Sequence, residues 1–205
     1  MPPAVDDAGM AKVLLVVAVA AVWLATGHER GVSEQRLATI SSELAARPVS
    51  VHCQSFGAEL VDVTSEAGTV EFDQRGRPGD VTKLKRKVCR ALDRMRGDIG
   101  KPELACVESG NRCPARIHDE VWAATVLAHE SMHLAGEIRE DIAECEAMQK
   151  TALVAQRLGA GKKLARSVAA YAWKYVYPEA REDYRMLDCF NGGPFDLRPG
   201  DPHWP

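Results

Sequence analysis

The stretch His129-Glu130-Ser131-Met132-His133 constrains the fold more than any other feature of the sequence. Two histidines four residues apart share one face of an α-helix, where their imidazoles can bind one Zn²⁺. A glutamate between them lies beside such a metal without ligating it and can act as a general base. The apolar positions that place this motif on a buried helix are Val121, Ala124, Leu127, Ala128, Met132 and Leu134.

A third metal ligand has to come from the carboxylates that follow the motif, because a catalytic zinc takes three protein ligands. On one straight helix Glu140 would lie about 10 Å from His133 along the axis, too far to share a metal. Gly136 can end the helix in a left-handed conformation and turn the chain back. In the resulting helical hairpin Glu140 lies opposite His133, and Glu144 opposite His129. We therefore expect Glu140 to be the third ligand and Glu144 to orient His129 through its second ring nitrogen.

These residues resemble a known family. The motif is the HExxH signature of zinc hydrolases, and residues 140–147 resemble the E-x-x-A-D-x-x-A pattern of CAAX-protease-like and heat-shock-protease-like members. The chain thus resembles the gluzincin branch of the zincin metallopeptidases, although its interval from His133 to Glu140 is shorter. The resemblance implies a zinc metallopeptidase that hydrolyses peptide bonds, with Glu130 as general base. The implied zinc ligands are His129, His133 and Glu140, with Glu144 where the family keeps an aspartate.

Other interpretations of the motif lead to different proteins. HExxHxxG also begins the metzincin motif, but Arg139 occupies the place of its third histidine. The two histidines can also be structural, beside a solvated acidic face, in which case the chain would be a non-catalytic exported zinc-binding or cell-envelope interaction module. A peptidase also needs a group that stabilises the oxyanion of its transition state. Candidates that the sequence does not rank are Tyr171, Tyr175, Tyr177, Tyr184 and His203.

An apolar run at residues 13–26 follows Lys12 near the N-terminus. Its length suits the core of a signal peptide better than a membrane span, which needs about 20 residues. We therefore expect residues 1–31 to be a signal peptide or a short membrane anchor. The remaining chain is then extracytoplasmic, either secreted or associated with a membrane through residues 13–26.

Cysteine usage agrees with export. The chain has six cysteines and no C-x-x-C pair, which favours disulfides over zinc-ribbon ligands. Buried free thiols are the alternative for a cytosolic protein. Six cysteines allow fifteen pairings, and the sequence does not decide among them. One set that it allows is Cys106–Cys113 across a short loop, Cys145–Cys189 and Cys53–Cys89.

Hydrophobic patterning predicts one α+β domain over residues 32–190, mostly helical, with the HExxH helix packed on a second metal-ligand helix. Strands over residues 49–54 and 68–73, with a third near Leu60–Val63, should form a small antiparallel sheet. Resemblance to zincins implies that an edge of this sheet aligns an extended substrate. Helices are expected at residues 33–47, from Asp80 to Met95, and near 138–158, 162–176 and 179–187, before an irregular Gly/Pro-rich tail at 191–205.

Charge excludes one class of partner. The formal net charge is −3, with 26 basic and 29 acidic residues, which gives no reason to expect nucleic acid. The expected partner is a protein or peptide substrate. Basic residues that cluster before the motif are interpreted as a solvated helix face; they are Lys83, Lys85, Arg86, Lys87 and Arg90.

Overall fold

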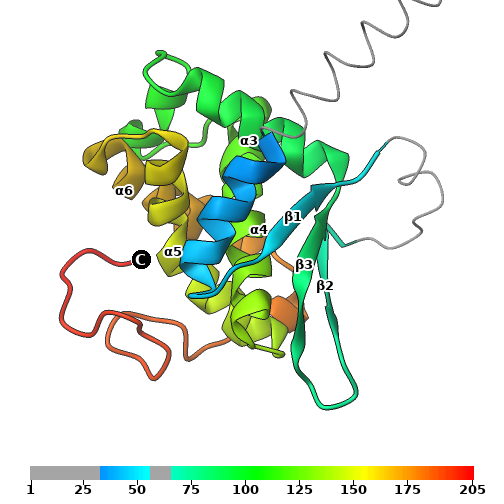
Figure 1. Cartoon of the computed structure of the whole chain (residues 1–205). Helices are drawn as coiled ribbons and strands as arrows, with labels where there is room; N and C mark the ends of the chain where they lie inside the picture. The colour runs from blue at the N-terminus through cyan, green and yellow to red at the C-terminus, as the bar shows by residue number, and fades with distance from the viewer. Residues whose placement is uncertain (1–32, 56–65) are drawn as a thin grey trace, which may run out of the picture.

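The computed structural model describes residues 33–55 and 66–205, and places a small sheet against one side of a group of helices (Figure 1). The expected α+β class with mostly helical content is confirmed. The apolar run at 13–26 and the strand expected near Leu60–Val63 lie outside the described residues. A first described helix covers residues 33–44 and is followed by α3 (Arg86–Asp98), α4 (Ala115–Ala135), α5 (Glu140–Leu158) and α6 (Lys162–Tyr171).

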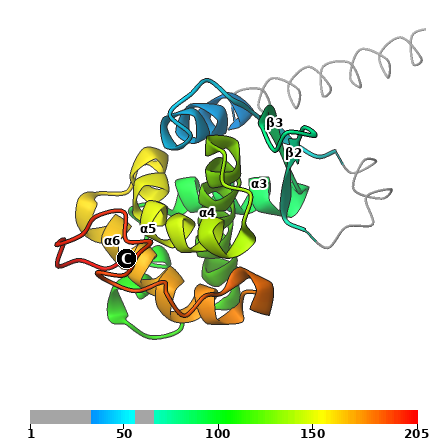
Figure 2. The ribbon, with the colours of Figure 1, turned by 90° about the horizontal axis from the view of Figure 1, so that it is seen from below.

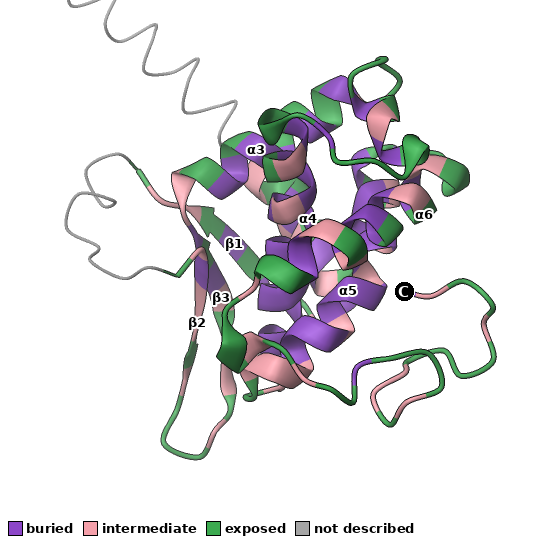
Figure 3. Cartoon of the chain, turned by 180° about the vertical axis from the view of Figure 1, so that it is seen from behind, coloured by how far each residue is buried: buried purple, intermediate pink, exposed green. Residues whose placement is uncertain are grey.

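Helix α4 is the centre of the molecule, and most of its residues between Ile117 and Leu134 are buried (Figure 3). It ends at Gly136, whose φ of 113° is left-handed. The N–H of Glu137 then donates to the Met132 carbonyl at 3.1 Å, which closes the helix end as a left-handed glycine cap does. Helix α5 returns beside α4 (Figure 2). The hairpin predicted at Gly136 is therefore confirmed.

The sheet has three strands in the order β1-β3-β2. Strand β2 (Gly68–Phe72) pairs antiparallel with β3 (Pro78–Leu84), whereas β1 (Ser50–Cys53) pairs parallel with β3. The expected antiparallel sheet is thus a mixed one, because β3 lies between the two strands that the sequence predicted.

Strand β3 replaces the start of a predicted helix. The sequence favoured a helix from Asp80, whereas α3 begins only at Arg86. Thr82 and Leu84 are buried and Lys83 between them is exposed, so the segment has the period of a strand. Leu84 also continues the helical spacing of α3, which is why both patterns fit it. Asp80 pairs with Arg47 and caps no helix.

The remaining connections contain short helices. Where a loop was expected at 97–116 there is a 3₁₀ helix, Leu104–Ser109. Helix α6 continues into a π-helical turn, Ala172–Val176, and the helix predicted near 179–187 is limited to the 3₁₀ turn Glu182–Tyr184. The first helix ends before Ala46, whose φ is 53°. The tail has no helix or strand, but the Gln149 side chain holds it to α5 through hydrogen bonds of 2.8 Å to the Phe195 carbonyl and the Leu197 N–H.

The expected disulfides are present, and of the fifteen possible pairings the structure has the set that the sequence suggested. Cys53–Cys89 joins β1 to α3, Cys106–Cys113 closes a loop before α4, and Cys145–Cys189 joins α5 to the C-terminal segment. Such a set indicates an oxidising, extracytoplasmic environment. Within the described ranges, no helix is both long enough and apolar enough to cross a membrane.

Removing Cys145–Cys189 should lower the free energy of unfolding more than removing Cys106–Cys113. The two bridges span 44 and 7 residues. In the chain-entropy model, loops of these sizes correspond to about 4 and about 2.5 kcal/mol. Urea unfolding of the two double Cys→Ala variants measures the difference. Equal losses, or a larger loss for the short loop, would contradict the ranking.

Candidate metal centre

The two motif histidines on α4 and Glu140 on α5 converge on one point. His129 Nε2 lies 3.0 Å from His133 Nε2 and 3.0 Å from Glu140 Oε2, and His133 Nε2 lies 3.2 Å from the same oxygen. Both histidines are almost fully buried, and Glu140 is partly exposed. The three atoms that the sequence proposed as ligands are therefore brought together.

Hydrogen bonds on the other side of each ring fix where the imidazole protons are. His133 Nδ1 donates to the Glu137 carbonyl at 2.7 Å, an oxygen that can only accept. His129 Nδ1 donates to Glu144 Oε2 at 2.8 Å, as expected for a carboxylate that orients a metal ligand. In the neutral rings both Nε2 atoms then carry lone pairs that face each other and the Glu140 oxygen. Three acceptors this close repel one another unless a cation lies among them.

The donor set fits zinc in type and in spacing. Two imidazole nitrogens and one carboxylate oxygen are a ligand set of catalytic zinc sites. Zinc–ligand bonds of 2.0–2.1 Å in a tetrahedron place neighbouring ligand atoms about 3.3 Å apart. The observed separations of 3.0–3.2 Å are close to this value.

Two aromatic rings hold the imidazoles from outside the metal position. Tyr184, in the turn before the tail, stacks on His129 with ring centroids 5.2 Å apart. Phe72 of β2 meets His133 edge to face at 5.9 Å. Both imidazoles are thus fixed in rotation as well as in tautomer, which prepares a site for its metal before binding.

Electrostatics favours a positive charge at this point. Burial lowers the pKa of His129, but the Glu140 and Glu144 carboxylates outweigh it and raise the pKa to about 10. Burial raises the pKa of Glu140, but the two imidazoles outweigh it and hold the pKa well below its usual range. Protons and a metal ion therefore compete for this site, and metal binding should weaken as the pH falls.

Glu130 lies beside these ligands under the sheet. Its side chain is 5% exposed, and the Thr82 hydroxyl of β3 donates to Oε2 at 3.4 Å. Gly68 of β2 lies so close that a Cβ there would be 2.6 Å from the Glu130 carboxyl carbon. Burial raises the pKa of Glu130 to about 7, against the lowering effect of His129 and His133. A carboxylate of this pKa can both accept and donate a proton at neutral pH.

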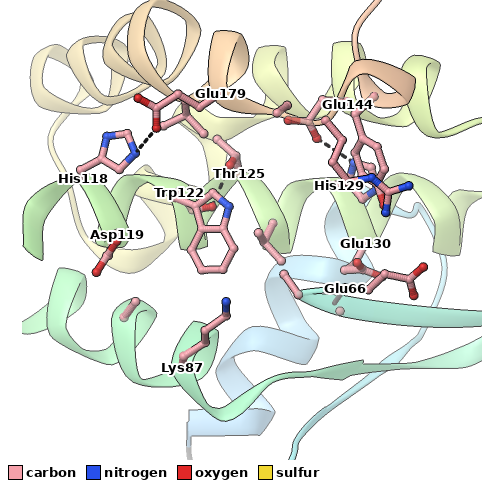
Figure 4. Close-up of a pocket in the computed structure, with 18 of the residues that line it drawn as sticks. Glu66, Lys87, His118, Asp119, Trp122, Thr125, His129, Glu130, Glu144 and Glu179 are labelled. Carbon is pink, nitrogen blue, oxygen red and sulfur yellow. Dashed lines mark hydrogen bonds and ion pairs between the residues drawn. The ribbon is translucent and has the colours of Figure 1, made fainter. Parts of the chain in front are cut away.

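A cleft of about 850 Å³ opens at Glu130 and His129 and extends along α4 to His118. Figure 4 shows His129, Glu130 and Glu144 at one end and His118 with Glu179 at the other. Helix α3 forms the facing wall. Of the three candidate ligands, His129 lines this cleft, together with Glu130 and Glu144.

The structure distinguishes among the residues that were candidates for stabilising the oxyanion. Three of the tyrosine hydroxyls are engaged elsewhere: Tyr171 with the Cys113 N–H, Tyr175 with the Gly110 carbonyl and Tyr177 with the backbone of Met186. His203 is exposed and bonds Asp201. Tyr184 alone among the candidates lines the cleft beside His129. Burial and the Glu140 carboxylate, with which the phenol makes a hydrogen bond, raise the pKa of Tyr184, so its hydroxyl stays protonated.

No protein-family model, curated protein or solved structure matches the chain. Sequence reasoning missed Gly68, Thr82, Phe72 and the Glu137 carbonyl as parts of this centre. None carries a local signal, because each reaches the site through the sheet or through the turn after α4.

Proposed function

We propose that this protein is an extracytoplasmic zinc-dependent metallopeptidase of gluzincin type. The observation that carries the proposal is the convergence of His129 Nε2, His133 Nε2 and Glu140 Oε2 on one point. The buried carboxylate of Glu130 lies nearby, and His129 and Glu130 both line the cleft. These three residues would hold the metal. A bound Zn²⁺ lowers the pKa of water towards 7 and polarises a carbonyl oxygen.

The chain's own residues supply the proton transfers and the positioning. Glu130 accepts a proton from the attacking water and returns it to the leaving amine, which its pKa near 7 permits. Tyr184 stacks on His129 and lines the cleft, and its hydroxyl would exchange its hydrogen bond with Glu140 for one to the oxygen on which negative charge develops. The cleft along α4 orients the peptide and limits access of bulk water.

A non-catalytic zinc module explains less of the geometry. A structural zinc site is closed by a fourth protein ligand, whereas the group found among residues 33–55 and 66–205 has three. A buried glutamate with its pKa raised by desolvation also costs stability. A catalytic role accounts for both the missing fourth ligand and the buried glutamate. A purely structural site would gain from neither.

Zinc loading and peptide hydrolysis should appear and disappear together. We expect the purified protein to contain about one zinc per chain and to cleave a mixed peptide library. Chelation should abolish both properties, and added Zn²⁺ should restore both. Elemental mass spectrometry measures the zinc content, and peptide mass spectrometry measures the cleavage. Cleavage by the metal-free protein, or failure to take up zinc, would refute the proposal.

A further inference from the structure

We propose that the cleft selects peptides that carry a carboxylate about three to four residues from the cleaved bond, and that Lys87 and Arg90 bind this carboxylate. The inference rests on the proposed peptidase function and specifies its substrate class. The carboxylate belongs either to an Asp or Glu side chain or to the C-terminus of the peptide.

The basic residues of α3 form one wall of the cleft. Lys87 and Arg90 both line it, together with Trp122 of the facing helix. Lys87 Nζ lies over the Trp122 ring, 4.9 Å from its centroid, and Figure 4 shows the two side chains facing each other across the cleft. Lys87 and Arg90 are exposed, as the sequence predicted, and they also line the cleft.

Lys87 and Arg90 have no acidic partner among the residues that the structure describes. Within the described part of the chain, no carboxylate lies within ion-pair distance of Lys87 or Arg90, although Arg94 one turn further along pairs with Glu120. Glu179, on the opposite wall, is paired with Arg112 and His118. Asp119 and Glu66 also line the cleft, and neither forms an ion pair with Lys87 or Arg90 among the described residues. Lys87 and Arg90 therefore offer two positive charges to a ligand.

The position of these charges in α3 also costs stability. Lys87 lies in the first turn of the helix, which contains no acidic residue. Positive charges at a helix N-terminus oppose the helix dipole, which favours anions there. The same dipole adds to the attraction that the cleft exerts on a carboxylate.

The distance from the metal ligands sets the substrate position. Trp122 precedes His129 by seven residues, or about 10 Å along α4. An extended peptide advances about 3.3 Å per residue, so its third residue from the cleaved bond reaches Trp122 and Lys87. Arg90 lies one turn beyond Lys87, at the place of the fourth residue.

Matched peptides test the inference on the full zinc-loaded chain. A cleaved library peptide is synthesised in Glu and Gln versions at the third and fourth positions, and with a free or amidated C-terminus. We expect wild type to prefer the carboxylate form in at least one pair by about tenfold in kcat/KM, as for a charge-assisted hydrogen bond. Arg90→Ala and Lys87→Ala should each reduce this ratio. Arg96→Ala, an exposed arginine of the same helix that does not line the cleft, should leave it unchanged.

Binding to the Glu130→Gln protein separates this inference from the proposed function. Fluorescence anisotropy compares labelled Glu-rich and Gln-rich decapeptides of equal length. If wild type cleaves no peptide, but the protein still binds the Glu-rich peptide more tightly and loses this preference in Arg90→Ala, the peptidase function is refuted and the binding site stands. If wild type cleaves both members of every peptide pair with equal kcat/KM, the binding site is refuted and the peptidase function stands. The same conclusion follows if Arg90→Ala and Arg96→Ala reduce the carboxylate preference equally.

Discussion

Glu130→Gln is expected to keep about one zinc per chain and to lose peptide hydrolysis by about 10³-fold, within the range that a general base contributes. The amide has the size of the carboxylate, so it fits the space between Thr82 and Gly68. It cannot accept the proton of the attacking water. Zinc content and kcat/KM on one cleaved peptide measure the two parts of the expectation.

Glu120→Gln is the matched control for this variant. Glu120 lies on the same helix, is fully buried and has a pKa that burial also raises to about 7. It contacts Arg116, away from the metal ligands. Its variant should therefore change the free energy of unfolding and leave hydrolysis near wild type. Similar losses of activity in both variants would show that a buried charge in α4, and not a base at the metal, explains the result.

The parts of the site that the sequence predicts are those fixed by spacing along one helix or across one turn. His129 and His133 share a face because they are four residues apart, and Gly136 makes the turn that sets Glu140 opposite them. Export predicts that the six cysteines form disulfides, but the sequence leaves their pairing open, because one close pair such as Cys106–Cys113 does not fix the other two. Helical periodicity and one glycine turn determine the metal-site residues that can be predicted.

Features that depend on packing are not predictable in the same way. Leu84 fits both a strand and a helix, and only hydrogen bonds from β1 and β2 on its two sides decide for the strand. Tyr184 is equivalent to the other tyrosines until the chain after α6 returns over His129. Arg90 looks like a solvated residue until α3 packs against α4 and turns it into the cleft.

Glu140→Ala is expected to lower zinc affinity far more than Glu144→Ala, and Asp141→Ala should have little effect. Glu140 Oε2 lies within 3.2 Å of both Nε2 atoms, whereas Glu144 contacts only Nδ1 of His129. Loss of an orienting partner typically weakens metal binding about 10- to 100-fold, and loss of a ligand should exceed that. Asp141 pairs with Arg139 in the same helical turn and controls for removing a carboxylate from the start of α5.

Competition with a chelator of known affinity measures zinc binding by the three variants, and circular dichroism checks that each keeps the helical content of wild type. The ranking follows from the register of the hairpin at Gly136, which sets Glu140 against the metal-facing edges of both imidazoles. A shift of one turn in α5 would exchange the two glutamates. Loss of zinc from Glu144→Ala with retention by Glu140→Ala would therefore show that Glu144 is the ligand and that this register is wrong.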